Sequence, residues 1–496
     1  MAPEAKRSGG TRRNRRPLGV LRELCGKVVS VSSRQPERAL AVHATPMIAS
    51  IPGRVLNWAA GVALGLTLVL LPFWWHTVLL RGTRPDLYFT YQSVLVYAGD
   101  VLLGAALLMW GADRLIQHLA FALPPRGISL WGVALAAWCT LSLVWSVQPA
   151  LSLAFVLRLV FGVTAVLFLI NHGFSSRQMA VWLTAGLLLQ SGIAVAEVAL
   201  QSATFLRPLA LTWPGDLAVS QSGTSVVESL VGGRWLRAYG TLPHPNVLGG
   251  FLLVYLAGPA LGYLRTGGKV WLLPWLLGVA ALWLTLSRGA WVAALSGGAA
   301  LLALLPGAYR RRALVLGLFA LPAVLALSLA LPNVVLTRLT PEAASAAPLE
   351  RLSLAERERF GLAAQDLWAR HRWLGVGGGA YMVAAADLTD LQAPLEPPHS
   401  VPLLAGAELG VIGLALGTGL AAAIGRRLWA ERRKGSPAAA IFGAVLIAVA
   451  VSAAFDHFWW TMPPAQTLSW LLLAMWLRST STPTDGFRVA FRSRAV

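Results

Sequence analysis

Charged side chains are scarce in this sequence, and their scarcity excludes an ordinary water-soluble fold. Asp, Glu, Lys and Arg together make up 12% of the 496 residues, whereas 56% of the residues are hydrophobic. A soluble chain of this length would need a far more polar surface. Apolar stretches of membrane-spanning length recur along the chain instead. They predict an all-α protein that crosses a bilayer many times.

We expect about twelve membrane-spanning helices. They are centred near residues 55–80, 93–111, 128–146, 151–171, 178–201, 246–264, 270–286, 289–306, 313–331, 401–424, 437–456 and 462–477. The expected organisation is a basic cytoplasmic tail (1–54), a transmembrane domain (55–478) and a short cytoplasmic tail (479–496). Two outer segments, 202–244 and 332–400, are long enough to hold structure of their own.

Cysteine and the common cofactor motifs are also lacking. The two cysteines, Cys25 and Cys139, fall in the basic tail and in a span, so they predict neither a disulfide framework nor a metal site. The chain has no Walker loop and no His-Glu-x-x-His pattern. The run Gly375-Val-Gly-Gly-Gly379 follows an expected helix and not a strand, which excludes a dinucleotide fingerprint. No outer cluster of carboxylates predicts a divalent cation, so we expect no metal and no cofactor.

The formal net charge of +20 is mostly a signal of topology. With the N-terminus in the cytoplasm, most Lys and Arg fall on the inner side, including the clusters at 310–312 and 426–434. This distribution predicts that both termini are cytoplasmic and argues against a nucleic-acid partner. The first fifty or so residues are rich in Arg and Ser with almost no apolar run, and we expect them to be largely disordered.

Two arginines at the predicted outer face are candidates for binding an anion. Arg288 lies between two short apolar stretches in Leu-Ser-Arg-Gly-Ala-Trp, at the outer end of a helical hairpin. A guanidinium there is either a phosphate ligand or an interface residue that reaches the headgroups. Arg237 lies before Pro243-His-Pro-Asn246, a pattern that predicts a capped helix entry with outward N–H groups. Arg234 is the local alternative to Arg237.

Two histidines and a carboxylate share this side. His399 ends the second outer segment, where a neutral imidazole can accept a proton from an attacking hydroxyl. Glu408, inside the next span, needs a partner, and we expect an outer Arg or His. His244 is interpreted as a turn residue.

The remaining membrane-embedded charges are expected to serve structure. We expect Asp100 and Arg158 to pair, although Arg158 has the alternative of reaching the anion site. The sequence Asp456-His-Phe-Trp-Trp is interpreted as part of an interfacial aromatic belt.

The second outer segment contains an expected helix from about Leu352 to Trp373. One face of it is apolar and comprises Phe360, Ala363, Ala364, Leu367 and Trp368. The helix is expected either to lie on the membrane or over a site, or to pack on the protein surface.

Five short motifs occur in an order that resembles the bacterial O-antigen ligase and O-antigen polymerase superfamily. They span roughly residues 95–475 and are Ser-Leu-Val-Trp-Ser-Val-Gln-Pro-Ala at 142–150, Arg237…Gly-Thr…Pro-Asn246, Leu-Ser-Arg288-Gly-Ala-Trp, Arg359…His371-Arg-Trp-Leu-Gly-Val-Gly-Gly-Gly-Ala-Tyr381, and His399-Ser…Glu408-Leu-Gly-Val-Ile-Gly-Leu. Ser400 departs from the pattern, because family members commonly have Asn there. This departure puts in question a side-chain amide that positions the acceptor.

The resemblance implies a polytopic glycosyltransferase of the C type in the bacterial inner membrane, with its active site facing the periplasm. Such enzymes take a glycan from an undecaprenyl pyrophosphate donor. By motif, His399 would be the catalytic base, and Arg288 and Arg237 would bind the pyrophosphate. Glu408, Asn246, Arg359 and Arg158 would support the site.

Three functions stay open at this point. A ligase would pass the glycan to the lipid A–core oligosaccharide, and a polymerase would pass it to another lipid-linked repeat unit. A flippase or other transporter would favour an inverted repeat and polar groups through the full membrane depth, and the sequence shows neither.

Overall fold

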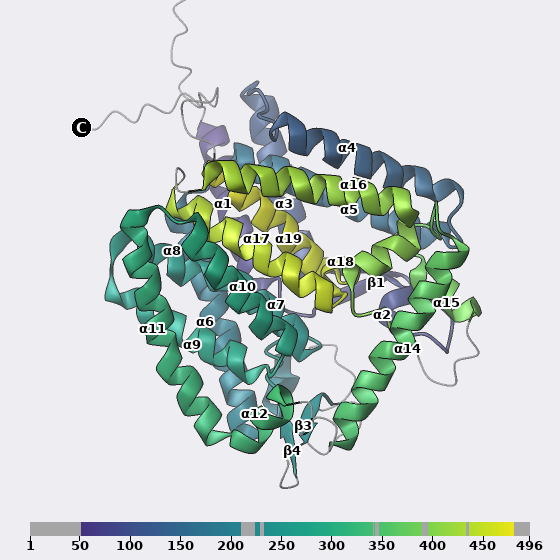
Figure 1. Cartoon of the computed structure of the whole chain (residues 1–496). Coiled ribbons are helices and arrows are strands. Elements are labelled where there is room, and N and C mark those ends of the chain that lie inside the picture. The colour runs from purple at the N-terminus through teal and green to yellow at the C-terminus, as the bar shows by residue number, and fades with distance from the viewer. Residues whose placement is uncertain are drawn as a thin grey trace, which may run out of the picture. The chain divides into compact units, whose positions relative to one another are not determined.

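The computed structural model describes residues 51–209, 224–228, 233–340, 342, 347–388, 395–432 and 436–480. These residues are mostly helical (Figure 1). The tails were expected at 1–54 and 479–496; of these, residues 1–50 and 481–496 lie outside the described residues, whereas 51–54 and 479–480 belong to the first and last helices.

Long apolar helices make up the membrane domain. They are α1 (Ile51–Leu70), α3 (Ala98–Ile116), α4 (Arg126–Leu141), α5 (Pro149–Asn171), α6 (Ser176–Leu200), α7 (Pro245–Tyr255) continued by α8 (Ala257–Thr266), α9 (Leu272–Leu284), α10 (Arg288–Leu304), α11 (Gly307–Ala330), α16 (Val401–Glu431), α17 (Pro437–Phe455) and α19 (Pro463–Thr480). Within the described residues, eight helices are long and apolar enough to cross a membrane, with α9 and α10 as shorter apolar helices. The structure thus supports a polytopic helical membrane protein, and the count of about twelve spans stays a prediction.

Short elements connect and cover these helices. They are β1 (His76–Leu80), α2 (Phe89–Gln92), β2 (Val94–Tyr97), the 3-10 turns η1 (Ser142–Val144), η2 (Thr204–Leu209) and η3 (Lys269–Trp271), β3 (Val226–Glu228), β4 (Arg234–Leu236), α12 (Pro332–Leu339), α14 (Pro348–Arg370), α15 (Tyr381–Leu388) and α18 (Phe458–Thr461). Two antiparallel hairpins form, β1 with β2 and β3 with β4. In the second hairpin Glu228 lies opposite Arg234.

The first two expected spans were too long at their outer ends. Residues 76–80 and 94–97, expected to be helical, form the β1–β2 hairpin, in which His76 lies opposite Tyr97. The helix before the hairpin ends at Leu70, just ahead of Pro72, which has no N–H to continue a helix. The apolar composition of these segments reflects a partly buried hairpin and not further helix.

The continuous segment α7–α8 lies at the centre of the core. In the part of this segment that is long enough to cross a membrane, 94% of the residues are buried. Its side chains, such as Phe251 and Tyr255, pack with those of α6, α17 and α19 in one large hydrophobic cluster. Figure 1 shows α10 alongside α17, and α4 alongside α16. A site at the start of α7 is therefore anchored in the most deeply buried of the eight candidate spans.

The apolar face of α14 packs on the protein itself. Phe360, Ala364 and Leu367 are buried in a second cluster with α15 and the start of α16. The helix therefore packs on the protein surface, one of the two possibilities from the sequence. It also lies over a site, the other possibility, because its N-terminal half, Phe360 included, lines a cavity that the next section describes.

A broken helix holds the glycine-rich loop that follows α14. Gly410 interrupts α16 with a φ of 68°, and a Cβ there would lie 2.1 Å from the Trp373 carbonyl oxygen. The loop pairs with the break through hydrogen bonds from Val376 N to Ala407 O (3.1 Å) and from Gly377 N to Glu408 O (2.9 Å). Only glycine fits both the backbone angle and the close approach at this break.

Candidate active site

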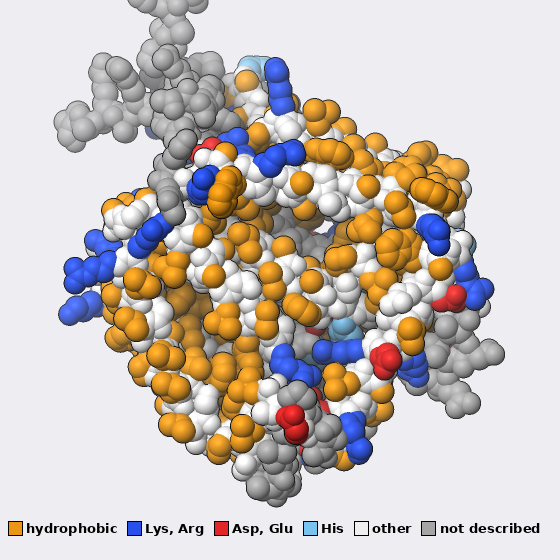
Figure 2. All heavy atoms as spheres, viewed as in Figure 1, with side chains coloured by type: hydrophobic (Ala, Val, Ile, Leu, Met, Phe, Trp, Pro, Cys, Tyr) orange, Lys and Arg blue, Asp and Glu red, His pale blue; other side chains and the backbone are white. Residues whose placement is uncertain are grey.

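A cavity of about 1120 Å³ lies between the hairpin β3–β4, the starts of α7 and α10, α12, α14, and the ends of α17 and of the 395–400 segment. Its charged and imidazole lining comprises Arg234, Arg237, Arg288, Arg338, Arg357, Glu228, Glu350, Glu356, Glu396, Asp456, His244 and His399. Figure 2 shows basic side chains and a histidine gathered in a hollow between α10 and α14, on a face that is otherwise largely apolar. All the residues that the sequence proposed for catalysis and pyrophosphate binding line this one cavity.

Arg288 is the first residue of α10, and a tight connection holds it there. Ser287 caps the helix by accepting a hydrogen bond from Ala290 N (3.4 Å). Leu286 adopts a φ of 49°, a left-handed conformation that L side chains rarely take, so the turn from α9 is strained. The Arg288 side chain remains 35% exposed and lies 3.6 Å from a Glu350 carboxylate oxygen. It is thus a fixed cation that a ligand in the cavity can reach.

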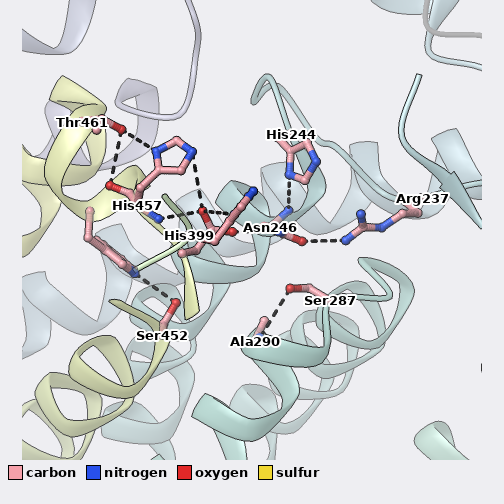
Figure 3. A network of polar contacts seen from close by, with 11 residues as sticks. Arg237, His244, Asn246, Ser287, Ala290, His399, Ser452, His457 and Thr461 are labelled. Atoms are coloured by element: carbon pink, nitrogen blue, oxygen red, sulfur yellow. Dashed lines mark hydrogen bonds and ion pairs between the residues drawn. The ribbon is translucent and has the colours of Figure 1, made fainter. Parts of the chain in front are cut away.

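Arg237 is buried and bound on several sides. Its Nε donates to Thr285 O (2.8 Å), its Nη1 to Ser225 Oγ (2.7 Å) and its Nη2 to Asn246 Oδ1 (2.7 Å). The side chain therefore ties the β3–β4 hairpin to the end of α9 and the start of α7. Figure 3 shows its bond to Asn246. Burial lowers the pKa of Arg237 well below its usual value, with nearby Arg338 contributing. Arg234, on β4, lines the same cavity.

The start of α7 brings His244 and Asn246 to the cavity. His244 is the N-cap residue and accepts a hydrogen bond from Asn246 N at its Nδ1 (3.1 Å). Burial, assisted by Arg237, lowers the pKa of His244 well below its usual value. His244 is thus a turn residue, as the sequence indicated. Asn246 connects Arg237 to Asp456. Its Oδ1 accepts from Arg237, and its Nδ2 donates to Asp456 Oδ2 at 2.8 Å.

His399 faces the carboxylate of Asp456. His399 Nδ1 lies 3.5 Å from Asp456 Oδ1. Asp456 is buried, which by itself would raise its pKa, but the adjacent His399 imidazole more than offsets this and lowers the pKa of Asp456 below its usual range. With Nδ1 toward the carboxylate, Nε2 is the His399 nitrogen on the opposite side of the ring. A carboxylate, an imidazole and a cavity in this order suit a general base.

The aromatic-belt interpretation of Asp456-His-Phe-Trp-Trp was wrong. Phe458 and Trp459 are buried, and Trp459 Nε1 donates to Ser452 Oγ (3.0 Å). His457 is buried as well, and its Nδ1 contacts Thr461 Oγ1 at 2.8 Å. Burial lowers the pKa of His457 to about 4, with Asp456 opposing the shift. The segment packs inside the protein, where most of its polar side-chain groups have hydrogen-bond partners.

Arg338, Arg357, Glu350 and Glu396 were not predicted from the sequence. Arg338 Nη1 donates to Glu350 Oε2 (2.7 Å), and both side chains are buried in the cavity wall. Burial lowers the pKa of Arg338 to about 10, and burial also raises the pKa of Glu396. No motif marks these positions, which lie within the long outer segment among several other charges. Only the packing of α12, α14 and the 395–400 segment around the cavity identifies them.

Three of the proposed supporting residues lie elsewhere. Glu408 accepts hydrogen bonds from Gly379 N (2.9 Å) and Trp460 Nε1 (2.7 Å), so the expected Arg or His partner was wrong. Arg158 pairs with Asp100 at 2.6 Å, as predicted. Glu408 and Arg158 line a separate cavity of about 120 Å³. Arg359 is not among the residues that line the large cavity, and its guanidinium lies 5.0 Å from the Phe360 ring centre.

The structure also brings together side chains that could hold a metal ion. In the described part of the chain, His399, Asp456 and His457 each offer a ligand atom, and these atoms lie within 4.8 Å of one another. The sequence did not indicate this cluster, because His399 is distant from the other two residues in sequence. The cluster also contains only one carboxylate, whereas the sequence was searched for a group of carboxylates.

Part of the chain matches a known protein family. The family model described as O-antigen ligase matches residues 273–418, which run from α9 into α16. The matched segment includes Arg288, Arg338, Glu350 and His399. Arg237, Asn246 and Asp456 lie outside it. No curated protein matches the chain significantly.

Proposed function

We propose, from the O-antigen ligase family model that matches residues 273–418, that the chain is a member of this superfamily and transfers a glycan from an undecaprenyl pyrophosphate donor to an acceptor sugar hydroxyl. The observation that carries the proposal is the shared cavity: His399 and Arg288 line it together with Arg237, Arg234 and Arg338. An acidic leaving group and a hydroxyl nucleophile need a cluster of cations and a base within one cavity.

His399 is proposed as the general base. Asp456 would hold the ring with Nδ1 protonated and stabilise the imidazolium that forms. Nε2 would then accept the proton of the acceptor hydroxyl as the oxygen attacks the anomeric carbon. The donor glycosyl–oxygen bond breaks, and the electron pair leaves with the pyrophosphate. Attack from the face opposite the leaving group inverts the anomeric centre.

Arg288 is proposed as the main ligand of the departing pyrophosphate. It is fixed at a helix start, partly exposed, and faces a carboxylate that an incoming anion can replace. Arg338 lies on the other side of the same Glu350 carboxylate and extends the cationic wall. Three N–H donors of Arg237 are bound to protein acceptors, so we assign this side chain to the scaffold of the site. Because Arg237 also lines the cavity, we assign it to the phosphate site as well. Fixed cations can stabilise the leaving group, so the proposed step needs no metal.

The site is proposed to open toward the periplasmic side of the inner membrane, as the basic inner segments predict. The cavity, at about 1120 Å³, is large for a small-molecule site and would accommodate a diphosphate together with sugars of donor and acceptor. The same chemistry would serve a polymerase. A ligase would use lipid A–core as acceptor, and a polymerase would use a second lipid-linked glycan.

The test is transfer by purified protein. Protein in detergent is incubated with an undecaprenyl-pyrophosphate-linked glycan and either lipid A–core or a second lipid-linked glycan, and products are identified by mass spectrometry. Arg288→Ala should lower turnover about 100-fold or more, because a cation that binds developing charge is lost. Arg351→Ala, an exposed α14 arginine outside the cavity lining, is the matched control. Transfer by Arg288→Ala at the parental rate would refute the assignment.

A further inference from the structure

Three ligand atoms converge beside the proposed base. His399 Nδ1 lies 3.5 Å and His457 Nε2 lies 4.0 Å from the same oxygen, Oδ1 of Asp456. All three ligand atoms lie within 4.8 Å of one another. In a tetrahedral zinc site with bonds of about 2.1 Å, neighbouring ligand atoms are about 3.4 Å apart. The three side chains are therefore within small adjustments of metal-binding geometry.

The protein also sets the tautomer of His457 that a metal requires. Thr461 Oγ1 donates to the His457 carbonyl oxygen (3.3 Å), so at its other contact it accepts from His457 Nδ1–H (2.8 Å). A neutral ring with Nδ1 protonated carries its lone pair on Nε2. That nitrogen faces the Asp456 carboxylate, and two acceptors that face each other leave a place for a cation.

The carboxylate is held from behind. Asn246 Nδ2 donates to Asp456 Oδ2 (2.8 Å), and the backbone N–H of His457 donates to Oδ1 (2.8 Å). These contacts orient the second lone pair of Oδ1 toward the two rings. His399 Nδ1, a buried atom, pairs with Asp456 Oδ1 only at 3.5 Å and makes no shorter hydrogen bond among the described residues. Hydrogen bonds that orient ligands in this way are typical of metal sites in proteins.

We propose that His399, Asp456 and His457 form a binding site for a divalent transition-metal ion, with Zn²⁺ as the best-suited ion, and that its occupancy inhibits glycan transfer. Two imidazoles and one carboxylate suit Zn²⁺ and exclude Mg²⁺ or Ca²⁺, which prefer oxygen ligands. His399 and Asp456 line the large cavity, so the fourth coordination position opens toward it.

Inhibition follows from the chemistry of His399 and rests on the proposed function. A metal on Nδ1 forces the proton of the neutral ring onto Nε2. The nitrogen that would accept the acceptor proton is then already protonated. The ion also takes the Asp456 oxygen that would stabilise the imidazolium. Metal binding itself does not depend on the proposed function.

Binding is measured on untagged full-length protein in detergent. After exposure to Zn²⁺ and gel filtration, metal analysis should find about one ion retained per chain, and Co²⁺ should give the visible absorption of a four-coordinate site. His457→Asn keeps an amide donor near Thr461 but removes the Nε2 ligand, and should weaken binding about 100-fold. His371→Asn, an exposed histidine at the end of α14, is the matched control and should bind as the parent does.

X-ray absorption at the zinc edge of the parent protein keeps the test independent of how the variants fold. It should show nitrogen and oxygen ligands with the scattering of two imidazoles. The site is refuted if the parent retains no Zn²⁺, if His457→Asn binds as tightly as the parent, or if imidazole scattering is absent.

The transfer assay separates this inference from the proposed function. The chelator-treated parent should be active, should lose activity with added Zn²⁺ and should regain it with EDTA. His457→Asn, compared with its own metal-free rate, should need about 100-fold more Zn²⁺ for the same loss. Absence of transfer by metal-free parent would reject the proposed function and leave the binding result intact. Zn²⁺ binding at the site without inhibition would reject the inhibitory role.

Discussion

The substitution Asp456→Asn tests the proposed base most directly, because it changes one atom of a fully engaged side chain. Asp456 Oδ2 accepts from Asn246, and Oδ1 accepts from the His457 backbone N–H and faces His399. An amide has one oxygen and one NH₂ group. If the NH₂ group takes the place of Oδ2, it meets the Asn246 amide donor, and if it takes the place of Oδ1, it meets the His457 backbone N–H donor. If it faces His399, it also favours the tautomer with Nε2 protonated, which cannot act as the base.

The expected loss can be worked from the distance of 3.5 Å between His399 Nδ1 and Asp456 Oδ1. Opposite unit charges at that distance interact by about 5 kcal/mol at an effective dielectric constant of about 20. The His399 side chain is 18% exposed, so solvent screens part of this energy. About 3–4 kcal/mol of imidazolium stabilisation should be lost, which corresponds to a fall in kcat of about 10²- to 10³-fold. The mismatched donor should lower the stability of the fold by about 1–3 kcal/mol.

The assay is the initial rate of glycan transfer at saturating donor, with thermal unfolding followed in parallel. Asp366→Asn is the matched control, because Asp366 is exposed and its ion pair among the described residues is with Arg370 in the following turn of α14. A lower kcat with a nearly unchanged donor KM is expected, because the carboxylate acts on the base and not on donor binding. Asp456→Asn with the parental kcat, in a protein that unfolds at the parental temperature, would refute the dyad.

Three further predictions concern buried charges. Glu408→Ala should destabilise the protein by about 3 kcal/mol, because several buried donors lose their acceptor; Glu408→Gln, which can keep the two shorter bonds, should cost less, as measured by thermal unfolding. Asp100→Ala should cost about 2–3 kcal/mol, less than for a fully buried pair, because the partly buried Arg158 loses its ion pair. Asp100→Ala combined with Arg158→Met should recover much of this loss in the same assay. Glu350→Gln should lower the donor KM several-fold, because a carboxylate 3.6 Å from Arg288 would no longer compete with the donor phosphates; an unchanged or raised KM would contradict this.

Local patterns predicted much of the architecture. Runs of apolar residues marked the helices, and the two short stretches on either side of Arg288 are indeed two helices, α9 and α10, with that residue at the start of the second. The two helices pack mainly on other elements, α9 on α6 and α11 and α10 on α17, and not on each other as a hairpin would. The α14 helix was expected within a few residues of its ends. The Asp100–Arg158 pair was predictable because two lone charges inside neighbouring spans have few other ways to be neutralised. In each case the signal is a property of nearby residues or of the membrane.

Other features could not be predicted, because they depend on which distant segments meet. The β1–β2 hairpin was taken for helix, since apolar residues suit either element when few are considered. Glu408 was given a cationic partner, although backbone N–H groups of the glycine-rich loop and an indole satisfy it. Asp456 was assigned to a belt of aromatics, because nothing local reveals that the end of α17 faces His399.

The sequence by itself determined that this is a helical membrane protein, and it identified an arginine and a histidine at the starts of helices. Both can be recognised from the sequence alone, because the length of an apolar run and an isolated charge beside it are local properties of the chain. The tertiary structure decided what those residues face. It joined Asp456 and His457 to His399, set Glu350 between Arg288 and Arg338, and removed Glu408 and Arg158 to another cavity. The physical reason is that hydrogen bonds and ion pairs form over about 3–4 Å, so the chemistry of a site depends on packing between helices that the sequence does not encode locally.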